Sequence, residues 1–392
     1  MNRNKYHYRL RHRYVITAIV LACIFLLPGI SASASGAWAA SDGTLPIEIY
    51  LNGTRLISDV PPVLKDDRTF VPIRVIGEAL GYYVDYIDGT GTVTMSHYES
   101  GSDIAMTVGE PFADVNGHII DLPVPAFIDN GRTLAPVRFL SEALGSRVDW
   151  NPGYGYAPDT VNIYSPYPVK TSGGVVQIAS RVESQSWELE GGTWGNVEIG
   201  YDLCAPIFTI PGFVKLSSTI NKQIADRADR IIDEITSVYD EQSAFDNPDE
   251  LELYGYADEF SYAVIEDDGH ILTLHIEGYA YYGGAHGLPY ILSYNIDYTH
   301  GKLLTLADIF KPEADYENIL LRRMSEIRES MPEEYEDVTE PDYIEEGSFD
   351  IRDGVLILYY HPYALSSFAR GFVEFRIPLN SLAEYINEDY LK

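Results

Sequence analysis

The sequence predicts an α+β protein: two small repeats, each a short helix on an antiparallel sheet, and then a larger domain of antiparallel sheet with packed helices. Three observations predict this. A string of fourteen residues recurs 64 positions later, which indicates an internal duplication. Apolar residues recur every three or four positions in one later stretch, as in a helix that docks on a sheet. Other stretches alternate between polar and apolar residues and are separated by turn residues, as strands are.

The first 39 residues predict export from the cytoplasm. They carry five Lys or Arg and no Asp or Glu, and an apolar run extends from Val15 to Ile30. Ala37-Trp38-Ala39 then has the small-x-small form of a signal-peptidase site. We therefore predict a signal peptide over 1–39 and a secreted protein of the extracellular cell envelope. The alternative is an uncleaved anchor, which would be the chain's contact with a membrane, although about sixteen apolar residues fall just short of the roughly 20 that span a bilayer.

Charge excludes one class of partner. Without residues 1–39 the chain keeps 59 acidic residues against 22 basic ones. Nucleic acid is not expected as a partner, because phosphate backbones require the opposite sign. An acidic surface attracts cationic partners, although it can also serve solubility alone. Cys204 would be the one thiol left, so the domains must be stabilised by ordinary cores rather than by disulfides within the chain.

The duplication lies in residues 46–166. The string from Arg68 to Gly81 returns as the string from Arg132 to Gly145, and we place the two repeats at 46–100 and 101–166. In each copy an Asn-Gly pair predicts a hairpin turn, and a proline precedes a run of helical spacing that ends at a glycine suited to a C-terminal cap. Strands are expected at 83–86 and 92–95, and again at 147–150 and 160–164.

These repeats resemble the copper amine oxidase N-terminal-like domain. The second copy carries that family's string almost whole from Gly131 to Trp150, and the first departs from it at Asp67 and Tyr86. The resemblance implies envelope stalk or adhesion modules. Copper chemistry is not expected, because the chain has no His-x-His pair and no Asn-Tyr dipeptide. Arg74 and Glu78, four apart on the expected helix, are interpreted as a local ion pair.

The remaining chain predicts the larger domain, preceded by a linker over 167–174 that is rich in Pro, Gly, Ser and Thr. Strands are expected at 175–188, 197–210, 260–265, 271–282, 290–298, 355–360 and 372–377. Helices are expected at 216–239, 316–329 and 379–386. Three tyrosines, Tyr290, Tyr294 and Tyr298, share one face of the strand at 290–298.

Residues 175–392 resemble the extracellular part of RsiV-type proteins. The string Tyr279–Gly287, the stretch Asn295–Phe310 and the later Tyr359–Ala364 carry the resemblance. We assign 266–392 to an RsiV-like C-terminal domain and 175–265 to the part that precedes it in RsiV and in the deacetylase PdaC. The resemblance implies binding of a wall-associated ligand, and one such domain recognises lysozyme. Deacetylase activity is not carried over, because no His-x-x-x-His motif occurs, and with fourteen residues before Val15 sigma-factor control is not expected.

Two sets of residues are candidate binding residues. The first set surrounds the glycine-rich string and consists of Tyr281, Tyr282, Gly283, Gly284 and His286. The second set is acidic and consists of Glu333, Glu334, Glu336 and Asp337. The glycines would let a ligand approach the backbone, or they simply form a turn whose histidine bonds the backbone. The acidic set predicts a mobile loop that contacts a cationic protein, or a solvated surface loop.

No catalytic residue, metal ligand or cofactor is predicted. No Gly-x-Ser-x-Gly string accompanies His286, and His270 and His275 are five apart on an expected strand, so they should face opposite ways. The leading hypothesis is therefore a non-catalytic secreted envelope protein with a stalk and a ligand-binding domain. Its partner would be a basic wall-lytic protein such as lysozyme, or a peptidoglycan component. The alternatives are a wall-polysaccharide adhesin that stacks tyrosines on sugars and a hydrolase centred on His286.

Overall fold

The computed structural model describes residues 47–98, 100–153, 158–189, 196–244, 255–283, 285–345 and 347–391. The predicted signal peptide lies outside these residues. The described chain forms two compact units, an N-terminal one that ends at Val182 and includes Pro206–Thr209, and a C-terminal one made of Glu183–Ala205 and the chain from Ile210 onward. The predicted α+β class is confirmed. Within the described ranges, no helix combines the length and the apolar character needed to cross a membrane.

The N-terminal unit consists of short strands and two one-to-two-turn helices. Its elements are β1 (Glu48–Leu51), β2 (Thr54–Leu56), β3 (Val63–Lys65), β4 (Arg68–Pro72), α2 (Ile73–Ala79), β5 (Tyr83–Ile87), β6 (Thr92–His97), β7 (Ser102–Thr107), β8 (Phe112–Val115), β9 (His118–Asp121), β10 (Phe127–Asp129), β11 (Arg132–Pro136), α3 (Val137–Ala143), β12 (Arg147–Asn151), β13 (Thr160–Tyr164) and β14 (Val169–Lys170). The strands and helices expected in both copies are therefore present. Each helix begins directly after a proline, Pro72 or Pro136, whose φ near −60° suits that position.

The two copies exchange strands instead of folding side by side. The sheets have the orders β12-β13-β1-β2, β10-β11-β4-β3 and β5-β6-β7-β8-β9. The first hairpin of copy one thus pairs with the last hairpin of copy two, and the last hairpin of copy one joins the first hairpin of copy two through β7. The middle sheet joins β4 to β11, the two equivalent strands. One apolar core, with Ile76 and its counterpart Leu140, serves both copies.

Asn52 is the polar centre of this unit. It follows β1 at a positive φ and is fully buried. Its side chain bonds backbone or hydroxyl groups of three segments, at Ser165 (2.7 and 3.2 Å), Tyr167 (3.0 Å), Ile178 (2.9 Å) and Ser180 (2.8 Å). The predicted linker over 167–174 contains one of these partners and also the strand β14, which pairs with residues 177 and 178. Asn116, the equivalent residue of copy two, is exposed.

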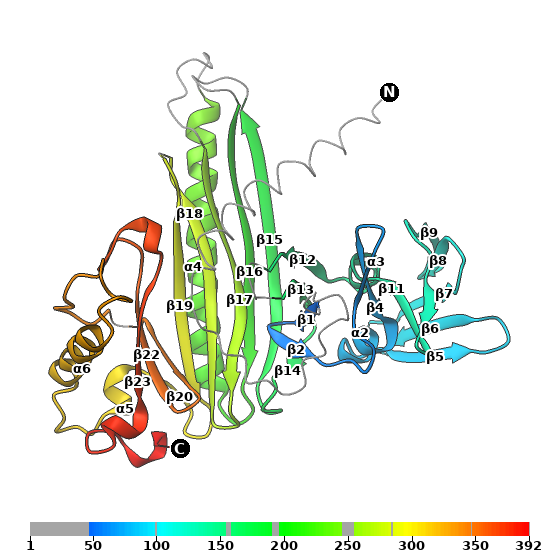
Figure 1. Ribbon diagram of the computed structural model, residues 1–392. Coiled ribbons are helices and arrows are strands. Elements are labelled where there is room, and N and C mark those ends of the chain that lie inside the picture. Colours follow the sequence, from blue (N-terminus) through cyan, green and yellow to red (C-terminus); the bar gives the residue numbers. More distant parts are fainter. Residues whose placement is uncertain are drawn as a thin grey trace. The chain divides into compact units, whose positions relative to one another are not determined.

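The C-terminal unit is built on long strands and one long helix (Figure 1). Its elements are β15 (Gln177–Leu189, which begins in the N-terminal unit), β16 (Val197–Thr209), α4 (Val214–Ser243), β17 (Tyr256–Asp267), β18 (Ile271–Tyr281), β19 (Leu288–Asp297), β20 (Lys302–Leu303), α5 (Leu306–Ile309), α6 (Tyr316–Ser330), β21 (Phe349–Arg352), β22 (Val355–Tyr360) and β23 (Val373–Pro378). The strands β15 to β20 are neighbours in that order, and β21, β22 and β23 form a second sheet. The pairing of β16 with β17 is parallel, because α4 is the crossover between them.

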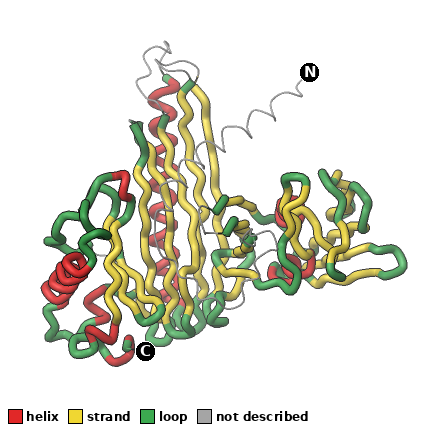
Figure 2. Tube along the Cα trace, in the orientation of Figure 1, coloured by secondary structure: helices red, strands yellow, loops and turns green. Residues whose placement is uncertain are grey.

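The long sheet has a different neighbour on each face. The helix α4 runs along one face (Figure 2) and buries an apolar stripe that includes Ile220, Ile224 and Ile235. On β19 the even-numbered Tyr290 is turned to that side, since Arg227 of α4 lies over its ring at 4.6 Å. The odd-numbered residues face the small sheet, where the Asn295 amide donates to the Phe349 carbonyl at 2.7 Å. The Tyr290 ring of the predicted tyrosine face therefore packs within the protein.

One expectation about the C-terminal part is wrong. Residues 379–386 do not form an α-helix; a 3-10 turn at Leu379–Leu382 is followed by Ile386, which bridges to Phe310. The apolar spacing of these residues fits both an α-helix and a 3-10 turn, and the bridge between Ile386 and Phe310 favours the 3-10 turn. The acidic segment after Met331 is a surface loop, as expected, but part of it packs on the unit. Tyr335 and Val338 within it are buried, and the Tyr335 hydroxyl donates to the Glu374 carbonyl at 2.7 Å.

Candidate functional site

The glycine-rich string forms the turn between β18 and β19. Tyr281 ends β18, Tyr282 is 48% exposed, and Gly283 has a φ of +83°, as expected for a turn glycine. Gly284 lies outside the described residues. Gly287 is required for space, because a Cβ there would lie 2.5 Å from the Tyr279 ring and 2.6 Å from the Ala280 carbonyl. Its N–H donates to the Tyr279 hydroxyl at 2.8 Å, which fixes the turn on the strand.

His286 belongs to an aromatic cluster that we define as His286, Tyr363 and Phe368. Its ring stacks on Phe368 with 3.9 Å between centroids, and its Nε2 lies 2.9 Å from the Tyr363 hydroxyl. Its Nδ1 lies 3.0 Å from the Gly287 carbonyl, so we assign the Nδ1–H tautomer, with Nε2 accepting from tyrosine. Both ring nitrogens are thus engaged, and no Ser or Cys side chain among the described residues bonds to His286. This arrangement favours a binding surface over a general base.

Tyr363 holds an unusual backbone conformation. Its φ is +73°, a region that residues other than glycine rarely adopt, and its side chain is 57% exposed. Such a conformation costs about 1–3 kcal/mol and is found mainly where the surrounding structure and function demand it. Here it presents an aromatic ring to solvent beside His286.

The acidic segment 333–337 is anchored by the same loop that carries Phe368. Glu333, Glu334, Glu336 and Asp337 are all exposed. Arg370, at the end of the 3-10 turn Phe368–Arg370, pairs with the Asp337 carboxylate and donates to the Glu334 carbonyl at 2.6 Å. The Ser366 hydroxyl donates to Asp337 at 3.0 Å. Burial opposes ionisation of Asp337, but Ser366 and Arg370 outweigh it and hold the pKa of that carboxyl below its usual value.

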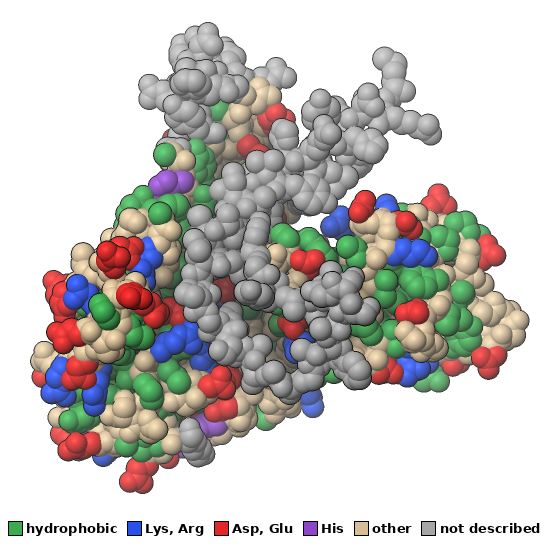
Figure 3. Space-filling view, in the orientation of Figure 1, with side chains coloured by type: hydrophobic (Ala, Val, Ile, Leu, Met, Phe, Trp, Pro, Cys, Tyr) green, Lys and Arg blue, Asp and Glu red, His purple; other side chains and the backbone are tan. Residues whose placement is uncertain are grey.

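Of the first predicted set, His286 is therefore linked to the acidic set through one loop. The loop 361–371 contacts His286 through Tyr363 and Phe368, and it contacts the acidic segment through Ser366 and Arg370. We call the result the composite surface: the aromatic cluster together with Glu333, Glu334, Glu336 and Asp337. Figure 3 shows acidic side chains, interspersed with basic ones, over the part of this unit that carries α6 in Figure 1.

Tyr282 also reaches inward. Its hydroxyl donates to Asp258 at 2.9 Å, and the Tyr290 hydroxyl donates to the other oxygen of the same carboxylate at 2.8 Å. Asp258 is 2% exposed, and this burial raises its pKa despite the two tyrosine hydroxyls. Tyr282 therefore links the turn to a buried carboxylate, and half of its surface remains available to a ligand.

A second buried cluster resembles a catalytic triad in composition but not in connectivity. His275 Nε2 lies 2.7 Å from Asp350, and the Ser293 hydroxyl donates to the same Asp350 oxygen at 2.6 Å. In a triad the serine bonds to the histidine; here both partners bond to the aspartate. Burial disfavours the charged imidazole, but Asp350 outweighs it and raises the pKa of His275 to about 9. The cluster is thus a buried ion pair.

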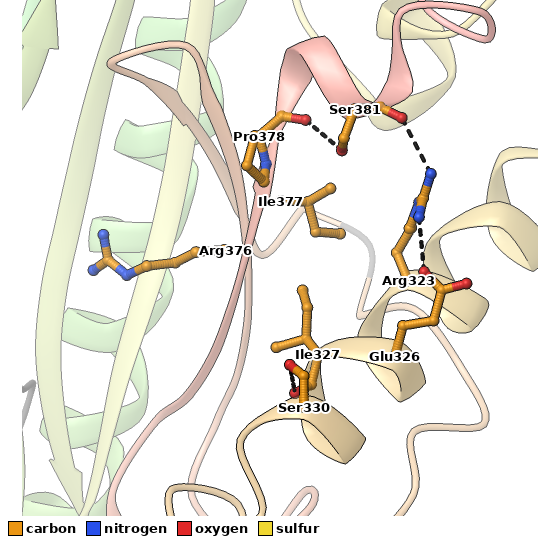
Figure 4. Close-up of a pocket in the computed structure, with 8 residues that line it drawn as sticks. All are labelled: Arg323, Glu326, Ile327, Ser330, Arg376, Ile377, Pro378 and Ser381. Atoms are coloured by element: carbon orange, nitrogen blue, oxygen red, sulfur yellow. Dashed lines mark hydrogen bonds and ion pairs between the residues drawn. The ribbon is translucent and has the colours of Figure 1, made fainter.

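Two further features complete the unit. A pocket of about 220 Å³ lies between α6 and β23 (Figure 4), and its charges are already paired, with Arg323 2.7 Å from Glu326 and Arg376 2.7 Å from Glu374.

At the opposite end of the β18–β19 hairpin from His286, ligand atoms of His270, Asp297 and His300 lie within 4.8 Å of one another. This group was not predicted from the sequence, where His270 was compared only with His275 along one expected strand.

Comparisons with known proteins match three parts of the chain. Residues 50–155 match the family model of the copper amine oxidase N-terminal domain, residues 198–289 that of deacetylase PdaC, and residues 307–380 that of a protein of unknown function, DUF3298. These confirm the predicted resemblances and their order. The string at 279–287, which we assigned to the RsiV-like C-terminal domain over 266–392, falls within the PdaC match. The composite surface thus combines residues of both matches.

Similar solved structures include two of the same kind. One is a DUF3298 family member from Bacteroides fragilis NCTC 9343, 18% identical, with a TM-score of 0.40, covering 54% of this chain and 94% of that one. The other is a DUF3298 family protein from Pseudomonas aeruginosa PAO1, 15% identical, with a TM-score of 0.39, covering 55% and 95%. No curated protein matches the chain.

Proposed function

We propose that this chain is a non-catalytic, secreted binding protein of the cell envelope, and that its composite surface binds a cationic wall-associated protein of the muramidase class. One observation supports this most: a single loop, 361–371, contacts both His286 and the exposed acidic segment 333–337, the latter through the Asp337 carboxylate and the Glu334 carbonyl. The predicted leader supports an extracellular location, and PdaC and DUF3298 domains are typical of envelope proteins.

The two halves of the surface suit such a partner in different ways. Exposed carboxylates attract basic side chains and accelerate encounter, while tyrosine supplies apolar area and a cation–π face for Lys or Arg. Glu333 and Glu336 have no ion pair or hydrogen bond among the described residues. They are therefore the carboxylates best placed to take a new partner, whereas Asp337 already holds Arg370.

The test is retention of the purified chain on immobilised lysozyme between about 0.05 and 0.5 M salt, a range in which screening of exposed charges becomes strong. The double variant Glu333→Gln/Glu336→Gln should bind about three- to tenfold more weakly at low salt, because each exposed pair contributes up to about 1 kcal/mol. The matched control is Glu313→Gln/Glu384→Gln, two exposed glutamates outside the composite surface. Absence of retention, or retention that neither salt nor the first variant reduces, contradicts the proposal.

A polysaccharide adhesin is the second candidate, and one observation favours it. Tyr83 and Tyr98 of the N-terminal unit are 71% and 101% exposed, and free tyrosine rings can stack on sugars. Sedimentation of the residue 46–182 fragment with insoluble peptidoglycan tests this, and Tyr83→Ala with Tyr98→Ala should abolish it. If the fragment stays in the supernatant, the adhesin is excluded and the muramidase proposal is unaffected.

A further inference from the structure

The open end of the β18–β19 hairpin brings His270 together with Asp297 and His300, which lie far from it in the sequence. Ile271 pairs with Asp297 across the two strands, so His270, one residue before, lies beside the turn that follows Asp297. His300 is in that turn, three residues after Asp297. The His270 Nε2 atom lies 3.3 Å from one Asp297 oxygen, and His300 Nδ1 lies 2.8 Å from the other.

The His270 Nε2 atom is unusual, because buried polar atoms normally have a hydrogen-bond partner. It is buried and has no hydrogen-bond partner among the described residues, although Asp297 is near. Its 3.3 Å separation from the Asp297 oxygen is the spacing of two ligands on one tetrahedral ion: with metal–ligand bonds of about 2.0–2.1 Å, such ligands stand about 3.3 Å apart. A buried imidazole nitrogen facing a carboxylate at that distance is arranged as a ligand pair is.

Hydrogen bonds from the following turn hold the Asp297 carboxylate in place. Asp297 is fully buried. Its oxygen that faces His270 also accepts from the His300 N–H at 2.8 Å and from the Thr299 N–H and hydroxyl at 3.0 and 2.9 Å, whereas the other oxygen is the one that His300 Nδ1 contacts. These hydrogen bonds fix the orientation of the carboxylate, as hydrogen bonds to metal ligands usually do.

The site reaches solvent at His300, whose side chain is 49% exposed, and His270 borders an acidic cavity. A cavity of about 280 Å³ has His270 in its wall, and the same wall carries four carboxylates, Glu266, Asp268, Asp353 and Asp389, against one basic residue, Arg352. An excess of negative charge along an entry path raises the local concentration of cations.

We propose that His270, Asp297 and His300 bind a divalent transition-metal ion of the zinc class, with the remaining coordination position open to water from this cavity. Two imidazoles and one carboxylate select such ions over calcium or magnesium, which prefer oxygen ligands. When the ion binds His300 Nδ1, the proton through which this nitrogen bonds Asp297 passes to Nε2 of the same half-exposed ring or to solvent. It ties the β18–β19 hairpin to the turn at 298–301 and to Tyr390, whose hydroxyl lies 3.1 Å from Asp297.

The test uses the full chain without an affinity tag, stripped with a chelator and titrated with zinc chloride by isothermal calorimetry. One equivalent should bind, and the melting temperature should rise with zinc, since an ion that binds only the folded state stabilises it. His300→Ala, at a half-exposed position, and His270→Gln should each weaken binding at least about tenfold. Calcium chloride should produce no binding heat.

His118→Ala, which removes an exposed histidine of β9 in the other unit, is the matched control and should bind zinc as the parent does. Melting in the presence of chelator shows that each variant is folded. The proposal is overturned if the parent binds no zinc, or if His300→Ala binds it with the parent's affinity. Because no residue of the composite surface is altered, the result is independent of the lysozyme experiment.

Discussion

The ion pair between His275 and Asp350 makes the stability of the C-terminal unit depend on pH. Both side chains are buried, at 8% and 1% exposure, and lie 2.7 Å apart. The imidazole is charged in the folded state because Asp350 faces it, whereas in the unfolded chain it titrates near 6.5. The perturbation we consider is a rise in pH from 6 to 9.5, compared between the parent and His275→Gln, which keeps a donor for Asp350 but cannot titrate.

The sign follows from proton counting. Between pH 6.5 and about 9 the folded state keeps the proton and the unfolded state has lost it, so the free energy of unfolding falls as pH rises, by about 1.36 kcal/mol per pH unit. The contribution is complete below pH 6.5 and is lost as the pH passes through 9. In total it amounts to about 3 kcal/mol, which corresponds to roughly 6–12 °C in melting temperature for a unit of this size.

Two measurements check this. Calorimetric melting of the parent should show that decline, while the His275→Gln variant should melt lower at pH 6 and approach the parent at pH 9.5. Imidazole resonances followed by NMR, assigned by the loss of one signal in the variant, should place the midpoint of His275 near 9. Parallel melting profiles for the two proteins, or a midpoint at or below 6.5, would refute the reasoning.

Two further substitutions test packing, and each is compared with a control substitution elsewhere in the same chain. Asn52→Ala should destabilise the N-terminal unit by about 3–5 kcal/mol, because it leaves several buried backbone groups without a hydrogen-bond partner. Asn116→Ala, at the equivalent exposed turn, should cost under about 1 kcal/mol. Chemical denaturation of the two variants measures both free energies of unfolding. Gly287→Ala should lower the melting temperature by several degrees, since the new methyl overlaps the Tyr279 ring, and Gly89→Ala, where nothing lies within 4 Å, should have little effect.

Periodicity and turn chemistry were sufficient for most individual elements. The strand expected at 355–360 and the helix expected at 316–329 match β22 and α6 almost to the residue, because their apolar spacing is regular and their ends carry turn residues. Where spacing was ambiguous, at 379–386, contacts made by Ile386 with a distant segment decided the form. Such contacts are not encoded in local pattern.

For the site residues as well, local sequence predicts the individual elements but not the contacts between distant ones. The turn around His286 could be predicted from its glycines, but its partners Tyr363 and Phe368 lie more than seventy residues away in the chain. Likewise, His270 and Asp297 meet only because Ile271 stands opposite Asp297, and a register one residue different would turn every side chain to the other face. Sequence spacing gives the members of such groups, while strand register decides which of them meet.

Strand exchange in the duplicated unit leads to a last prediction. If the second copy is absent, β1 has no β13 to pair with, and β6 lacks β7 and, beyond it, β8. The sheets of the first copy then have open edges, and its core lacks Leu140 and Ile163. Residues 46–100 alone should therefore be unfolded as a monomer by circular dichroism and show no cooperative melting, whereas residues 46–182, which keep every partner of Asn52, should fold. A symmetric dimer of the short fragment is compatible with this, because a second copy can supply the equivalent strands. A short fragment that is monomeric in sedimentation and still melts cooperatively would show that each copy is autonomous, and that the exchange does not provide the core.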